Sequence, residues 1–217
     1  TPDRVAVVLA VLLATVAVAG PASGATASGT TATPATPATD STVTRIAVAE
    51  NGTANWEVQI RTRLNSDADV ADYERFQERF RENTSTYLDS FRRSIRGVVA
   101  DATDETGRDM RAREFEASTS VQAVPRRWGI VTYEFEWTNF AAADGEALAV
   151  GDVFRGQFFL TGNDTLEVAA PGGYEVAAVE PDPVDRSEDR VRWTGRRTFA
   201  DDRPFVRFEP AVTPTPT

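Results

Sequence analysis

Carboxylates, hydroxyls and arginines are the side chains through which this 217-residue chain could do chemistry. It contains no histidine, cysteine or lysine, so all 23 basic residues are arginines, against 33 aspartates and glutamates. The absence of histidine and cysteine excludes a histidine-assisted serine or cysteine nucleophile, disulfides and the usual zinc or copper ligand sets. We expect no cofactor.

Paired carboxylates are the catalytic hypothesis that the sequence allows. Glycoside hydrolysis needs two acids, one kept protonated by burial and one left ionised. Glu134 and Glu136 are the pair to test, because they alternate with aromatic residues in a strand-like segment. That alternation also places both on the polar, outward face of the strand, where solvated side chains are expected. We therefore assign no catalytic residue.

Two acidic stretches partly resemble calcium sites. Residues 65–69 begin like a calcium loop, but Val70 and Phe76 take the places of its glycine and its bidentate glutamate. A helix cap built from Ser66 and Asp69 explains these aspartates better. The second stretch, in a proline-rich loop, contains Asp182, Asp185, Glu188 and Asp189. We interpret it as a solvated acidic loop and predict no metal site.

The sequence gives little support to anion binding. Arg126-Arg127 and Arg196-Arg197 could grip an anion, but balance against neighbouring acids is the simpler interpretation. The Pro-Gly-Gly segment 171–173 lacks the lysine and the helix of a phosphate-binding loop. Nucleic acid is not an expected partner, because phosphate binding needs clustered positive charge and the net charge here is -10.

Three Asn-x-Ser/Thr sequons are candidate N-glycosylation sites, if the chain is exported. Asn51 and Asn163 lie in predicted turns, where a glycan fits. Asn83 lies near the edge of a predicted apolar helix stripe and is less suited.

Apolar residues recur at helical spacing over 67–105, which predicts one long amphipathic helix. Ser66 and Asp69 form its predicted capping box, and Gly107 its C-terminal cap. Residues 83–86, Asn-Thr-Ser-Thr, are the weak point, because their poor helix propensity could kink or split the helix. The stripe keeps its phase across them, which favours a single helix.

Alternating segments on both sides of this helix predict strands. Before it, 43–48 and 55–64 form a predicted hairpin around the turn Asn51-Gly52. After it, we expect strands at 113–121, 128–138, 157–160, 165–169, 174–179, 191–194 and 205–208. The expected fold is α+β, one long helix packed on a mostly antiparallel sheet of about seven to nine strands. A β-sandwich with a helical insertion is the alternative.

The amino end has the pattern of an export signal. Arg4 precedes the apolar run 5–19, which is followed by small residues and is short for a spanning helix. Residues 1–25 are predicted to be a signal peptide or, alternatively, an amino-terminal anchor. The remaining predicted parts are a disordered Thr/Ala/Pro-rich linker (26–43), a single extracellular domain (44–210) and a Thr/Pro tail (211–217), beyond which a membrane anchor could follow.

An excess of acids with arginine in place of lysine is typical of salt-loving archaea. Surface carboxylates keep a protein hydrated where concentrated salt screens their repulsion. We therefore predict an acidic halophilic protein.

Five short segments follow one another along the predicted domain: Glu-Phe-Glu-Trp-Thr-Asn-Phe (134–140), Val-Gly-Asp-Val-Phe (150–154), Phe-Phe-Leu (158–160), Pro-Gly-Gly-Tyr (171–174) and Val-Arg-Trp-Thr-Gly (191–195). In order and spacing they resemble a family of haloarchaeal secreted or membrane-anchored domains of unknown function. The resemblance extends over roughly residues 44–209. It implies an ectodomain that follows a signal peptide and, in longer members, precedes a transmembrane helix and sometimes a winged-helix module. It supplies no catalytic residues.

Together these features predict a non-catalytic exported cell-surface glycoprotein domain of a haloarchaeon, acting in binding, sensing or envelope structure. Its partner would be an extracellular ligand or an envelope component, with membrane association through a terminal anchor. The alternative function is a carboxylate-dependent extracellular hydrolase such as a glycosidase.

Overall fold

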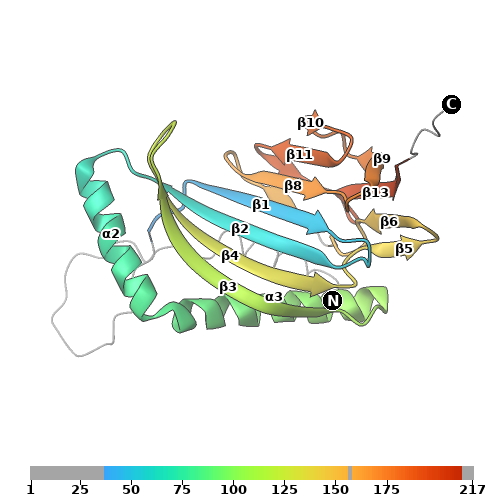
Figure 1. The fold of residues 1–217 in the computed structure, drawn as a ribbon, viewed down its shortest axis with the longest axis horizontal. Helices are drawn as coiled ribbons and strands as arrows, with labels where there is room; N and C mark the ends of the chain where they lie inside the picture. The colour runs from blue at the N-terminus through green and yellow to red at the C-terminus, as the bar shows by residue number, and fades with distance from the viewer. Residues whose placement is uncertain (1–36, 156–157, 212–217) are drawn as a thin grey trace.

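The computed structural model describes residues 37–155 and 158–211 (Figure 1). The predicted signal peptide or anchor, most of the predicted linker and all but Ala211 of the predicted tail lie outside these residues. Among the residues described, no helix is both long and apolar enough to cross a membrane.

The described chain is mostly β-structure, with two helices between its second and third strands. The elements are β1 (Ser41–Val48), β2 (Ala54–Arg63), α2 (Asp67–Glu82), α3 (Thr84–Thr106), β3 (Arg111–Gln122), β4 (Trp128–Thr138), β5 (Ala142–Asp144), β6 (Ala147–Val150), β7 (Phe159–Leu160), β8 (Thr165–Ala169), β9 (Tyr174–Glu180), β10 (Asp185–Arg186), β11 (Arg190–Thr194), β12 (Arg197–Thr198) and β13 (Phe205–Pro210).

A mixed seven-stranded sheet dominates the fold, in the order β10-β11-β8-β1-β2-β4-β3. Its strands pair antiparallel except β1 and β8, which run parallel. A four-stranded sheet, β5-β6-β13-β9, and the pair β12-β7 complete the β-structure. The expected α+β fold, one long helix on a mostly antiparallel sheet, was wrong, because the described chain is mostly β-structure with two helices and a large mixed sheet. The sequence pattern missed the short strands β5, β6, β10 and β12, which give no clear alternation.

The predicted helix over 67–105 is two helices. They meet at Asn83, whose φ of −126° and ψ of 25° interrupt the helical backbone. Thr84 Oγ1 donates to the carbonyl oxygen of Phe80 at 2.7 Å and so satisfies one acceptor near the break. The helices then run in different directions and cover successive parts of the curved large sheet (Figure 1). The continuous apolar phase concealed this break because both helices bury the same stripe.

Several local predictions are confirmed. Ser66 and Asp69 form a reciprocal capping box at the start of α2. Gly107 ends α3 with a left-handed φ of 72°. β1 and β2 form the expected antiparallel hairpin around Asn51.

One face of the large sheet is buried and the other is polar. Ile46, Trp56 and Phe135 lie opposite one another on β1, β2 and β4. They share one core cluster with apolar residues of α3, β6 and β13, so the helix and the four-stranded sheet cover the same face. The next position along each strand points the other way, and there Arg45 lies opposite Glu57.

The described chain enters and leaves at opposite ends of the parallel pair β1 and β8. Just before β1, the amide of Asp40 donates to the carbonyl oxygen of Arg61 at 2.9 Å. After β13, the amide of Ala211 donates to the carbonyl oxygen of Gly173, in the turn that follows β8. Because β1 and β8 run in the same direction, the start of one and the end of the other lie far apart.

Candidate functional site

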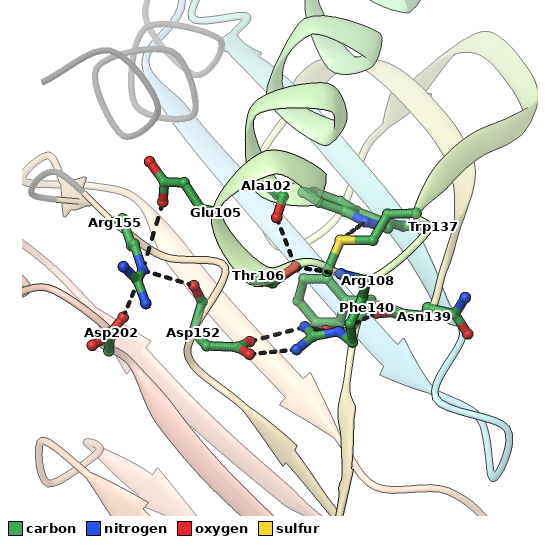
Figure 2. Close-up of polar contacts among 11 residues, drawn as sticks. Ala102, Glu105, Thr106, Arg108, Trp137, Asn139, Phe140, Asp152, Arg155 and Asp202 are labelled. Carbon is green, nitrogen blue, oxygen red and sulfur yellow. Dashed lines mark hydrogen bonds and ion pairs between the residues drawn. The ribbon is translucent and has the colours of Figure 1, made fainter. Parts of the chain in front are cut away.

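A cluster of charged side chains lies where the C-terminal end of α3 meets loops of the two larger sheets (Figure 2). Its members, which we name the arginine clamp, are Glu105, Arg108, Asp152, Arg155 and Asp202. Glu105 and Arg108 come from the end of α3 and the turn after it. Asp152 and Arg155 follow β6, and Asp202 precedes β13.

Arg108 joins three segments of the chain through its guanidinium group. It binds both carboxylate oxygens of Asp152, with 3.0 Å between Nη2 and Oδ1. Nε donates to the carbonyl oxygen of Asn139 at 3.0 Å, and Nη2 to that of Phe140 at 3.0 Å. Such a bidentate, charge-assisted contact fixes geometry as well as adding energy. Because all three guanidinium nitrogens make hydrogen bonds, Arg108 holds these segments together and has a structural role.

Arg155 connects the end of α3 to the loop before β13. Its Nε lies 3.1 Å from Asp202 Oδ1 and 3.6 Å from Glu105 Oε2, and also donates to the carbonyl oxygen of Asp152 at 3.3 Å. Glu105 needs such a partner, because a carboxylate is unfavourable at the negative C-terminal end of a helix. The two arginines thus hold Asp152 from both its carboxylate and its carbonyl oxygen.

Two residues of the clamp region adopt left-handed backbone angles. Asn139 has φ of 54° and Asp202 has φ of 58°. Asn139 Nδ2 donates to the carbonyl oxygen of Asp109 at 2.8 Å, and the amide of Asp202 donates to that of Phe154 at 2.8 Å. Asparagine and aspartate tolerate this region better than most residues, and surrounding contacts must hold them there.

The sequence did not identify the clamp. Arg108 and Asp152 are separated by 44 positions, and no spacing rule links an arginine after a helix to an aspartate after a short strand. One weak cue is available: Asp152 is a lone charge among apolar residues in the segment 150–154. That segment and the segment 134–140 both carry the family resemblance, and they meet at Arg108.

Each sequon asparagine is exposed, but the three amides differ in their contacts. Asn51 lies in the β1–β2 turn and accepts a hydrogen bond from the Thr53 amide at its Oδ1, at 3.0 Å. Asn163 lies in the turn before β8, and its Nδ2 donates to the carbonyl oxygen of Asp40 at 3.2 Å. Asn83 Nδ2 donates to the carbonyl oxygen of Arg79 at the end of α2, at 3.0 Å.

Glu134 and Glu136 lie on the polar face of the large sheet, on β4. Glu134 is exposed. Glu136 binds Arg113 of β3, with 2.6 Å between its Oε1 and Nη2. Strand pairing places Glu57 and Glu116 opposite Glu134 on its two sides. The pair is therefore part of a row of charged side chains across the sheet.

Carboxylates of both acidic stretches make hydrogen bonds or ion pairs within the protein. Asp69 Oδ2 accepts from the amides of Asn65 and Ser66 at 2.9 Å each. Hydrogen bonding from Ser66 lowers the pKa of Asp69 below its usual range. In the second stretch, Asp185 lies 2.6 Å from Arg192, and a hydrogen bond from Ser187 lowers the pKa of Asp189. Over residues 37–155 and 158–211, no group of three or more potential metal ligands is found.

The two arginine pairs do not form one site. Arg127, in the β3–β4 turn, lies 2.9 Å from Asp67 at the start of α2. Arg197, on β12, donates to the carbonyl oxygen of Asp182 at 2.7 Å. Arg127 thus pairs with an acidic side chain, whereas Arg197 contacts a backbone carbonyl.

Buried tyrosines lie between α2 and the large sheet. Burial raises the pKa of Tyr133 to about 12 and that of Tyr73 still higher. The ring of Tyr73 lies directly over Gly129 of β4, where an added Cβ would come within 2.4 Å of it. Both phenols stay neutral at ordinary pH, and the close contact with glycine indicates a packing role.

Comparison with known proteins gives a family. No curated protein matches the chain. Residues 45–174 match the family described as a domain of unknown function, DUF7345. The matched range includes Arg108 and Asp152 and ends at the start of β9, before Asp202. The expectation of an uncharacterised family is thereby confirmed, and since more than half of the sequence is matched, the chain belongs to the DUF7345 family of domains of unknown function.

Proposed function

We propose that this chain is a non-catalytic exported cell-surface domain of a haloarchaeon, acting in binding, sensing or envelope structure. The export-like pattern of residues 1–25 and the Thr/Pro-rich sequence on both sides of the folded part support surface display. Its partner is an extracellular ligand or an envelope component.

The placement of the chain ends is the observation that carries this proposal. The chain enters beside Asp40 and leaves beside Gly173, at opposite ends of β1 and β8. A domain with its ends at opposite poles fits in series between two extended segments. That arrangement suits a module of an envelope or of a stalk held away from the membrane.

The charged residues on the polar face of the large sheet support the proposal that the protein works at high salt. Arginines pair with acids there, as in Arg113 with Glu136 at 2.6 Å and Arg192 with Asp185 at 2.6 Å. Exposed pairs of this kind contribute little in dilute solution, about 0–1 kcal/mol. They keep the surface charged and hydrated without using lysine.

The contacts of the charged groups support a non-catalytic role. Arg108 and Asp152 are engaged with each other and with backbone carbonyls. Glu136, one of the two candidate hydrolase acids, is held by Arg113. A general acid raised in pKa by burial is what a hydrolase would need, and Glu134 lies exposed on the sheet.

Protease treatment of intact cells tests surface display. Cells kept at their growth salt are treated with an added salt-tolerant protease, and the released peptides are identified by mass spectrometry. We expect peptides from residues 41–210 in the released fraction, because the domain is outside. The matched control is a variant without residues 5–19, which should give these peptides only after lysis. Release from the full chain only after lysis would contradict the proposal.

A further inference from the structure

We infer that Asn51 is the asparagine of this chain that carries an N-linked glycan, in preference to Asn163 and Asn83. The inference rests on the proposed function, because glycosylation of this kind follows export. It deepens that function by choosing one sequon from three on the basis of the folded geometry.

The side chain of Asn51 has its amide nitrogen available. Its Oδ1 accepts from the amide of Thr53 at 3.0 Å, which closes a local turn and fixes the side-chain orientation. Among the described residues, no hydrogen bond from Nδ2 is found, and the residue is exposed. A sugar on Nδ2 therefore displaces no hydrogen bond found within residues 37–155 and 158–211.

The turn around Asn51 is held firmly by its neighbours. Gly52 has φ of 77°, its amide donates to the carbonyl oxygen of Ala49 at 2.9 Å, and its own carbonyl oxygen accepts from Ala141 at 2.9 Å. A Cβ on Gly52 would lie 2.9 Å from the oxygen of Ala141, so the close approach requires glycine. The asparagine is thus presented at a fixed end of the β1–β2 hairpin.

The position of Asn51 in the domain also favours modification. It follows β1, and so lies at the end of the sheet opposite Asp40, where the chain enters from the linker. Asn51 is therefore far from the attachment of the linker, at the end of β1 and β8 near which the chain leaves beside Gly173. Its exposed turn is open to a transferase at that end.

The other two asparagines use the same nitrogen to hold the fold. Asn163 Nδ2 donates to Asp40 beside the linker, and its neighbour Asp164 is buried and accepts from the Thr42 amide at 2.8 Å. Asn83 Nδ2 donates to Arg79 at the end of α2. Because an ordinary hydrogen bond must break to free the side chain, the free form of such an asparagine is populated about fivefold less. At either position the transferase must reach a nitrogen that this hydrogen bond holds against the backbone.

The chemistry is the transfer of a sugar from an activated phosphate donor. The bond that forms joins Asn51 Nδ2 to the anomeric carbon of the sugar. The bond that breaks joins that carbon to a phosphate oxygen of the donor, a glycosyl phosphate or diphosphate carried on a lipid. The phosphate leaves with the bonding electrons, and the amide loses one proton to a base of the transferase.

The test is site-resolved occupancy on protein recovered from its own high-salt cells. Peptides containing each asparagine are compared with and without sugar, together with the amino terminus. A Thr53→Val variant removes the hydroxyl of the Asn51 sequon, and Thr53→Ser keeps it. Valine suits this position because Thr53 is only 8% exposed. Both variants keep Asn51 and the Thr53 amide.

We expect occupancy at Asn51 at least about fivefold above that at Asn163 or Asn83, in line with one hydrogen bond. It should be lost in Thr53→Val and retained in Thr53→Ser. A processed, exported chain with a bare Asn51, or with higher occupancy at Asn163 or Asn83, would overturn this inference alone. An unprocessed, sugar-free chain inside the cells would overturn the proposed function as well.

Discussion

Glu134 lies between two other glutamates in a row across the polar face of the large sheet. Pairing of β4 with β3 places Glu116 opposite it, and pairing with β2 places Glu57 opposite it on the other side. Glu57 is partly neutralised by an ion pair with Arg45. We predict that Glu134→Gln stabilises the domain at low salt and has little effect at molar salt.

The magnitude follows from the strand register. Side-chain pairs directly opposite each other on neighbouring strands change stability by about 0.2–1 kcal/mol, and like charges in such a pair are destabilising. We take the repulsion between Glu134 and Glu116 to lie near the upper end of this range. The repulsion between Glu134 and Glu57 lies near the lower end, because Arg45 partly neutralises Glu57. The expected gain for Glu134→Gln is therefore about 1 kcal/mol at low salt. The screening length falls from about 10 Å at 0.1 M salt to about 3 Å at 1 M, less than the spacing of adjacent strands of about 5 Å.

The assay is urea unfolding of both proteins at about 0.1 M and about 2 M salt, conditions on either side of that screening change. The control is Glu50→Gln, which removes the same charge from an exposed position outside the strand register. We expect the control to gain less than Glu134→Gln at low salt. Equal gains in the two variants would mean that net charge alone matters. A gain for Glu134→Gln that is unchanged at high salt would refute the electrostatic reasoning.

Three further predictions concern packing, the clamp and ionisation. Arg108→Gln should lower the free energy of unfolding by about 2 kcal/mol, because it removes a charge-assisted hydrogen-bond network. A free energy from urea unfolding within about 0.5 kcal/mol of the parent value would contradict this prediction. Gly129→Ala should destabilise the domain by about 1–3 kcal/mol, because the new methyl group overlaps the ring of Tyr73. In the same assay Gly97→Ala, at an open position of a helix, should stabilise the domain by up to about 1 kcal/mol. Tyr133 should ionise near pH 12 in the folded protein and near pH 10 when unfolded, so the free energy of unfolding should fall as pH rises above 10, by about 2 kcal/mol at pH 12. Absorbance at the tyrosinate band measures the ionisation, and full ionisation of the folded protein near pH 10 would contradict this prediction.

Local features of this fold could be predicted because their causes are local. Ser66 and Asp69 are three positions apart, and their side chains cap each other's backbone amides whatever the rest of the chain does. Gly107 ends α3 because glycine adopts the left-handed angles at no cost. The hairpin around Asn51 follows in the same way from alternation and a turn signal.

Features that depend on distant partners were missed. The parallel pairing of β1 with β8 joins Val43 to Thr165, and nothing in either segment indicates the direction of the other. The break at Asn83 was visible only as weak propensity, and the helices on its two sides cover successive parts of the curved sheet. The clamp between Arg108 and Asp152 is likewise formed only when the helix end meets the segment after β6.

Surface export is tested most directly by the intact mass and location of the protein in fractions of its own high-salt cells. We predict recovery from the envelope or the medium, either without the residues before about position 25 or anchored through them, as a signal-like segment requires. An unprocessed chain in the cytoplasmic fraction, with no modification, would contradict the proposal of an exported surface domain.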